Sequence, residues 1–150
     1  DRIGFLDRKL RILNENTDNR KDWMDAAITA YQASKAYEWQ GDNLLLARES
    51  LLYAFIENYE YKFGERPNRE SVREIAYIIS WNVWQMDGLK GVIPNSCHDV
   101  ENRNLLGEVE MKPCPGCKTK NIHKHNGIPV LLKEFSSGDT CPFHMLCKDK

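Results

Sequence analysis

The sequence changes character at Pro94, and this change limits what the chain can fold into. Up to that residue, aliphatic and aromatic side chains recur at the three- and four-residue spacing of amphipathic helices. Beyond it, Asn, Gly, Pro, Cys and His replace the aliphatic periodicity, and no amphipathic stretch longer than about six residues remains. We therefore expect a helix-rich region over 1–95 and a Cys/His-rich tail over 96–150 that needs more than an apolar core to fold.

The overall composition is that of a folded protein without a dominant charge. Of 150 residues, 41% are hydrophobic and 29% are charged. A net charge of −1 excludes a globally basic nucleic-acid clamp and leaves only local basic patches. No apolar run reaches the roughly 18 to 20 residues that cross a bilayer, so we expect a cytoplasmic protein with no membrane contact. Because the sequence begins at Asp1 rather than Met, we expect a fragment or a processed chain.

The region before Pro94 should form four helices and two short strands. The apolar spacing predicts helices over 2–14, from an Asp18 or Asn19 cap to about 34, over 43–63, and from an Asn68 cap to about 81. The predicted strands are 35–39 and 82–86. Because two helices separate them, these strands should pair in parallel. The expected fold is mainly α with a small parallel β pair, a partial α/β unit, followed by a zinc-binding tail.

Cysteine and histidine residues in the tail have the spacing of a zinc site. In the C-P-x-C knuckle from Cys114 to Cys117, a tight turn lets both thiolates face one metal. The segment C-P-F-H at 141–144 repeats this spacing with an imidazole. Three thiolates and one imidazole form a full tetrahedral set for a structural zinc ion. The predicted ligands are Cys114, Cys117, Cys141 and His144.

Other ligands lie close enough in the sequence to take part. A rival quartet combines the first knuckle with Cys97 and His125. The remaining candidates are His98, His123 and Cys147. The segment H-K-H-N at 123–126 also permits a small zinc-supported nuclease of the His-Asn-His kind, in which one His activates water and another holds a catalytic metal.

A local basic patch accompanies these residues. The segment 111–133 contains five Lys and no Asp or Glu. Such side chains contact nucleic-acid phosphates in a salt-dependent manner. The lysines expected to contact DNA are Lys112, Lys118, Lys120 and Lys124.

Two segments of the chain carry a family resemblance. The first reads A-Y-E-W-Q-G-D-N over 36–43, followed by L-A-R-E-S-L-L over 46–52; the second reads I-S-W-N-V-W-Q-M-D-G-L over 79–89. They resemble the central region of bacterial adenine-specific DNA methyltransferases of restriction-modification type. The resemblance implies a partial Rossmann-like unit in which Glu38 binds the ribose hydroxyls of S-adenosylmethionine. It also implies that Asp87 accepts a hydrogen bond from the adenine amino group of this cofactor.

The resemblance is incomplete at two catalytic motifs. No glycine-rich G-x-G loop precedes Glu38, and no D-P-P-Y or N-P-P-Y segment is present to hold a flipped adenine. We therefore expect a truncated relative or fragment of an N6-adenine methyltransferase, acting as a cofactor-side and DNA-contacting scaffold and inactive without a partner chain. The alternatives are a phage or mobile-element zinc protein that antagonises a host defence enzyme by binding it, and the nuclease described above.

Overall fold

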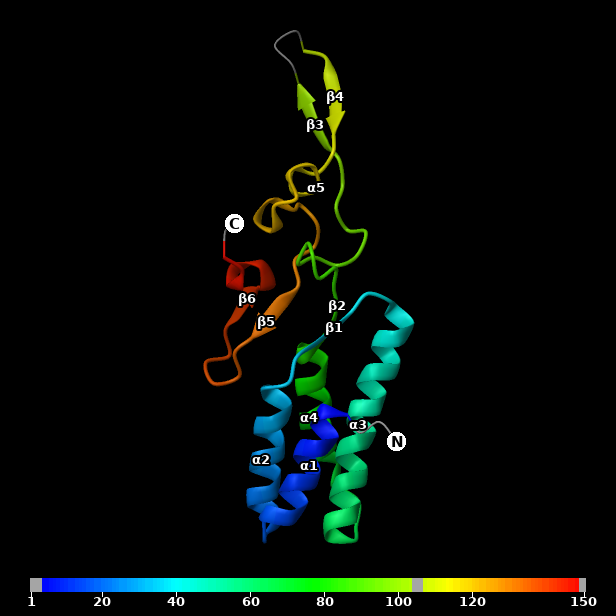
Figure 1. Cartoon of the computed structure of the whole chain (residues 1–150), viewed down its shortest axis with the longest axis vertical. Coiled ribbons are helices and arrows are strands. Elements are labelled where there is room, and N and C mark those ends of the chain that lie inside the picture. The colour runs from blue at the N-terminus through cyan, green and yellow to red at the C-terminus, as the bar shows by residue number, and fades with distance from the viewer. Residues whose placement is uncertain (1–3, 104–106, 149–150) are drawn as a thin grey trace. The chain divides into compact units, whose positions relative to one another are not determined.

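The computed structural model describes residues 4–103 and 107–148, and these fold mainly into helices, with small two-stranded sheets (Figure 1). Contacts divide the chain into two compact units. The helical unit comprises Asp1–Ala36 and Gly41–Trp84, and the second, Cys/His-rich unit comprises Tyr37–Gln40 and Gln85–Lys150. The composition change near residue 95 falls inside the second unit, because Val92 forms bridges to both Asp87 and Pro129.

The helical unit contains the four helices that the sequence predicted. They are α1 (Phe5–Asn16), α2 (Arg20–Gln32), α3 (Gly41–Phe63) and α4 (Arg69–Asn82). Helix α1 packs against α2 and α3, and α4 packs against the same two helices. The expected start of the first helix at residue 2 lies outside the described residues. Within the described part of the chain, no helix is both long and apolar enough to cross a membrane.

Asparagine side chains begin two of these helices. The Asn19 side chain accepts a hydrogen bond from the Asp22 N–H at 2.9 Å, and the Asn68 side chain accepts one from the Ser71 N–H at 2.8 Å. Both interactions satisfy a helix N–H that has no partner within the helix. The Asn68 cap was expected from the sequence and is confirmed; of the two expected candidates Asp18 and Asn19, Asn19 is the cap. Gly64 ends α3 with a φ of 71°, a left-handed conformation that suits glycine.

The core of the helical unit is aromatic. Trp23 is fully buried, and its ring lies 5.5–5.9 Å from the rings of Phe55, Tyr59 and Phe63. The Trp23 indole N–H donates to Asn14 Oδ1 at 2.8 Å, so its polar atom is paired. Aromatic pairs in this range of separation add stability beyond the area that they bury.

Two polar side chains donate hydrogen bonds to carbonyl groups at helix ends. The Nε and Nη2 groups of Arg48 donate to the Val83 carbonyl at 3.0 and 2.7 Å, directly after α4. The buried Asn82 donates to the carbonyls of Tyr31 and Gln32, the last two residues of α2. Because terminal carbonyls lack partners inside a helix, these contacts stabilise the ends of α4 and α2.

Two short strands form the parallel pair that the sequence predicted. They are β1 (Ala36–Glu38) and β2 (Val83–Gln85). The Met86 N–H, directly after β2, donates to the Glu38 carbonyl at 2.9 Å. The carboxyl ends of both strands therefore lie next to each other.

The second unit is built from short elements around a small core. Strands β3 (Val100–Arg103) and β4 (Val109–Lys112) form one antiparallel pair, and β5 (Leu131–Lys133) and β6 (Thr140–Pro142) form another. The remaining elements are α5 (Pro115–Thr119) and the 3-10 turns η1 (Ile122–Lys124) and η2 (Phe143–Leu146). Among the described residues of this unit, the buried apolar side chains besides Cys114 are Met86, Val92, Val130 and Leu132. Such a core is small, so a metal would add substantially to its stability.

Candidate metal centre

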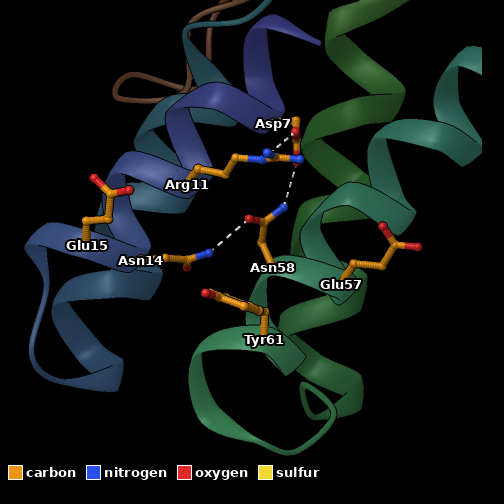
Figure 2. Close-up of a pocket in the computed structure, with 7 residues that line it drawn as sticks. All are labelled: Asp7, Arg11, Asn14, Glu15, Glu57, Asn58 and Tyr61. Atoms are coloured by element: carbon orange, nitrogen blue, oxygen red, sulfur yellow. Dashed lines mark hydrogen bonds and ion pairs between the residues drawn. The ribbon is translucent and has the colours of Figure 1, made fainter. Parts of the chain in front are cut away.

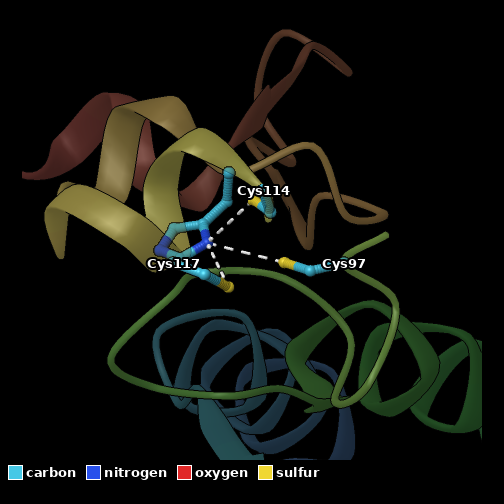
Figure 3. A group of neighbouring side chains, drawn as sticks. Cys97, Cys114 and Cys117 are labelled. Carbon is cyan, nitrogen blue, oxygen red and sulfur yellow. Dashed lines mark hydrogen bonds between the residues drawn. The ribbon is translucent and has the colours of Figure 1, made fainter. Parts of the chain in front are cut away.

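Three thiols and one imidazole converge in the second unit. The ligand atoms of Cys97, Cys114, Cys117 and His125 all lie within 4.8 Å of one another. The Nδ1 atom of His125 is 3.5 Å from the Cys97 sulfur and 3.7 Å from each of the other two sulfurs, as the dashed lines in Figure 3 mark. This group is the rival quartet of the sequence analysis.

The spacing of these atoms suits a tetrahedral zinc ion. Zinc lies about 2.3 Å from sulfur and about 2.0 Å from nitrogen, so ligand atoms around one ion are about 3.5 to 3.8 Å apart. The measured sulfur to nitrogen distances of 3.5 and 3.7 Å fall in this range. The cluster can therefore hold a metal ion, and its donors are those of a structural zinc site.

A β-hairpin brings the first two parts of the cluster together. In the β3–β4 pair, Val100 lies opposite Lys112. Cys97 precedes this pair by three residues and Cys114 follows it by two, so both lie at the open end of the hairpin. Cys117 then lies on α5, one turn after Cys114.

Gly116 allows the imidazole to approach the knuckle. A Cβ atom at this position would lie 2.5 Å from both Cγ and the backbone N of His125. Contacts this short do not occur between real atoms, so only glycine fits here. The G of C-P-G-C is thus a requirement of the cluster.

Asn126 fixes the loop that carries Cys97. Its side-chain Oδ1 accepts from the His98 N–H at 3.2 Å, and its Nδ2 donates to the His98 carbonyl at 2.8 Å. Its backbone N–H also points at the Cys114 sulfur, at 3.4 Å. One residue therefore connects three of the segments that supply ligands.

Within the cluster, the pKa values of Cys114 and Cys97 shift in opposite directions. Burial alone would raise the pKa of Cys114, but the backbone N–H groups of Asn126, Cys117 and Gly116 and the ring of His125 bring it down to about 6. Burial raises the pKa of Cys97 to about 11, and its hydrogen bonds to the other two thiols act in the same direction. In the absence of metal, these shifts favour the thiolate form of Cys114 and the protonated form of Cys97.

The structure places the two other predicted ligands elsewhere. Within the described residues, Cys141 and His144 belong to no group of three or more potential ligands. Cys141 lies on β6 opposite Leu132, and the His144 ring packs edge-on against that of His123, with centroids 5.8 Å apart. The structure therefore groups Cys114 and Cys117 with Cys97 and His125, and it does not group them with Cys141 and His144.

The same placement bears on the nuclease hypothesis. That hypothesis assigns His123 and His125 to catalysis, whereas the Nδ1 atom of His125 faces the three thiols. A histidine that ligates a structural metal is not available to bind a second, catalytic one.

Most of the expected DNA-contacting lysines lie close to the cluster in sequence. Lys118 is on α5, Lys120 is its C-cap, and Lys124 ends η1; all three are exposed. Lys112 lies on β4, where it forms an ion pair with Glu110 at 3.2 Å. The α5–η1 segment therefore carries basic side chains together with Cys117, and Cys114 and His125 flank it.

The two predicted cofactor residues lie at the parallel pair. Glu38 ends β1, and its Oε1 accepts from the N–H groups of Trp39 and Gln40 at 2.8 and 3.0 Å. Asp87 is 4% exposed; its Oδ1 accepts from the Leu89 N–H at 3.0 Å and its Oδ2 pairs with the Lys90 ammonium at 3.3 Å.

A separate polar groove lies in the helical unit, with a volume of about 580 Å³ (Figure 2). At its base, Asn58 Oδ1 accepts from Asn14 at 2.9 Å and Asn58 Nδ2 donates to Asp7 at 3.0 Å. Arg11 forms an ion pair with the same Asp7 at 2.9 Å. These contacts join α1 to α3, so we interpret the groove as a structural network.

Sequence reasoning overlooked Gly116 and Asn126 as parts of the centre. Gly116 carried a readable signal, because a small residue between two ligands indicates close approach. Asn126 carried none, since its role depends on a partner, His98, that is distant in sequence.

No protein-family model, curated protein or solved structure matches this chain.

Proposed function

We propose that this chain is the cofactor-side, DNA-contacting part of an S-adenosylmethionine-dependent DNA adenine methyltransferase, with a partial Rossmann-like strand pair and a zinc-stabilised basic module. The observation that supports this most directly is the position of two acidic residues. Glu38 ends β1 and Asp87 follows β2 by two residues, and the strands are parallel. Cofactors of open α/β sheets bind at the carboxyl ends of parallel strands.

The chemistry of the two carboxylates suits the two ends of an adenosine group. A carboxylate at a strand end can accept hydrogen bonds from both ribose hydroxyls, which is the role of Glu38 in this proposal. Asp87 would accept from the adenine amino group. The cofactor supplies the methyl group when bound; the glycine-rich loop and the N-P-P-Y segment would come from another chain.

Cofactor binding by this chain alone should be weak, because half of the usual contact surface is absent. Backbone NMR detects binding in the millimolar range, so we would titrate zinc-loaded chain with S-adenosylmethionine, with and without duplex DNA. We expect amide shifts confined to 37–40 and 85–89. The Glu38→Gln variant should weaken binding by about tenfold through loss of a charged hydrogen bond.

The control for this titration is Glu49→Gln, which removes an exposed carboxylate on α3. It should leave the amide shifts unchanged. Absence of any shift at millimolar cofactor, in the presence and absence of DNA, would contradict the proposal.

Methyl transfer needs a separate test with a partner. The chain alone should transfer no labelled methyl group to duplex DNA, because the groups that orient the target adenine are missing. Mixing it with a chain that carries the glycine-rich loop and the N-P-P-Y segment should produce activity. If no pairing produces transfer, a catalytic role is removed.

One observation favours the alternative of a protein antagonist. On α3, Leu46, Tyr53 and Tyr61 recur at seven and eight residues and are 59%, 55% and 83% exposed. Apolar side chains aligned on one helix face are typical of protein-binding surfaces. A pull-down that returns DNA but no protein would argue against this alternative.

A further inference from the structure

A pocket of about 760 Å³ lies beside the metal centre, within the second unit. Three segments form its walls: 88–90, the stretch from Gly116 to His125, and 147–148. Cys117 and His125 line it, so the metal centre itself shapes one side. Its volume falls in the range of sites that bind small molecules or single groups of a larger ligand.

The charged side chains that line the pocket are all basic. Each of the three wall segments contributes one lysine, and no Asp or Glu is among the lining residues. These lysines are Lys90, Lys120 and Lys148. Side chains that converge from separate segments create a positive site that no single stretch of sequence contains.

The positive charge remains when the metal centre is filled. A zinc ion with three thiolates and a neutral imidazole carries one net negative charge. The Lys90 ammonium is balanced by Asp87 at 3.3 Å. Lys120 and Lys148 are both exposed, and together they exceed the single negative charge of the metal centre. An anion is therefore the favoured occupant.

We infer that this pocket binds a phosphate group of a nucleic-acid strand, with Lys120 and Lys148 as its principal contacts. This inference rests on the proposed function in that DNA is the polymer expected to supply the phosphate. Ile122 and the 89% exposed Leu89 also line the pocket. They provide apolar surface for the sugar that follows the phosphate.

The pocket adds to the contacts expected from the basic segment 111–133. Lys90 and Lys148 lie outside that segment, and their positions along the chain do not group them with Lys120. Lys120 itself has a φ of 55°, a left-handed conformation that suits Asn or Gly better than Lys. A lysine at such a position is consistent with selection for its side chain rather than for its backbone preference.

The test is DNA binding by the full zinc-loaded chain, measured by fluorescence anisotropy with a labelled duplex over a series of salt concentrations. The variant is the double substitution Lys120→Gln with Lys148→Gln. We expect an affinity loss of about tenfold or more at 0.1 M salt, and a decrease of about two in the slope of log K against log salt. The charge-matched control is Lys21→Gln with Lys35→Gln, two exposed lysines of the helical unit, which should change neither.

Zinc content, measured by elemental analysis, shows whether each variant keeps its fold. A variant that retains stoichiometric zinc and binds duplex with unchanged affinity and salt slope would overturn the inference. If the double variant loses zinc, Lys120→Gln and Lys148→Gln are measured separately. A single variant that retains zinc and binds duplex with unchanged affinity and salt slope would likewise overturn the inference.

A second arm separates a strand phosphate from a free one. Inorganic phosphate is titrated into labelled chain while the amide signals of Lys120 and Asn121 are followed by NMR. Shifts with duplex at a much lower concentration than with phosphate support the strand as the source. Equal response to free phosphate, with no duplex binding, would overturn the strand assignment.

The two proposals fail in different ways. If the chain binds duplex through these lysines but shows no cofactor-induced amide shifts at 37–40, the pocket proposal stands and the methyltransferase proposal fails. If the chain shows cofactor-induced amide shifts but binds duplex independently of these lysines, the methyltransferase proposal stands and the pocket proposal fails.

Discussion

Gly116 has a hydrogen atom where other residues have a Cβ, and this difference decides whether His125 can join the metal centre. In an ordinary helix, Gly→Ala stabilises by up to about 1 kcal/mol. At Gly116 the sign should reverse, because the new Cβ would meet a backbone nitrogen of His125 at 2.5 Å. Gly116→Ala should lower zinc affinity by about 10- to 100-fold, measured by competition with a chromogenic chelator. Gly88→Ala, where a Cβ meets nothing within 4 Å, should leave it unchanged.

The choice between the two ligand quartets can be decided by zinc stoichiometry. Cys97→Ser and His125→Ala each remove a ligand of the observed cluster and should reduce bound zinc well below one equivalent. Cys141→Ser and His144→Ala should retain it. The reverse pattern, measured by elemental analysis after gel filtration, would restore the quartet that the sequence favoured.

Zinc affinity should fall as the pH falls. Zinc binds thiolates, so it must displace the proton of Cys97, whose pKa burial raises to about 11. This thiol alone should make the apparent affinity rise about tenfold per pH unit near neutrality. Below about pH 6 the decline should steepen, because Cys114 also becomes protonated. A flat profile in chelator competition would show that the thiols are already ionised.

Two of the four residues in the cluster could be paired from the sequence alone. Cys114 and Cys117 lie within one turn of each other, so their convergence is a local property of the knuckle. Cys97 and His125 converge through the register of the β3–β4 hairpin and through the Asn126 side chain. The spacing of residues along the sequence reveals neither the hairpin register nor the Asn126 contacts. The sequence therefore left two possible sets of four metal ligands open.

At the scale of elements, helices were the most predictable part of the fold. Caps at Asn19 and Asn68 and the apolar spacing between them depend on residues three or four positions apart. The short pieces of the second unit depend instead on distant partners. The β3–β4 hairpin lay in a stretch where no amphipathic pattern was found, because its side chains are largely exposed on both faces.

Arg48 lies in the segment 46–52 that carries the family resemblance, and its side chain has a structural role. Its side chain donates twice to the Val83 carbonyl and thus connects α3 to the end of α4. Arg48→Ala should lower the free energy of unfolding of the helical unit by about 1 to 2 kcal/mol. Chemical denaturation followed by circular dichroism would measure this, with the exposed Arg73→Ala as control. Equal midpoints for the two variants would contradict this role.

At the scale of the whole molecule, the two units should respond differently to loss of metal. The buried apolar side chains of the second unit are few, whereas the helical unit has its own aromatic core. Treatment with a strong zinc chelator should therefore expose 85–148 to protease and leave most of the helical circular dichroism signal intact. Simultaneous loss of the helical signal would show that one cooperative transition includes both units.

The division of the chain has a consequence for how such a protein can be inherited. Residues 37–40 belong to the metal-binding unit although α3 and α4 separate them from the rest of it. A recombination event that joined only residues 85–150 to another gene would leave behind residues 37–40, and with them β1 and most of β2. The second unit therefore cannot be transferred as one continuous stretch of sequence, and a gene that acquires it intact must also acquire α3 and α4 between its two parts.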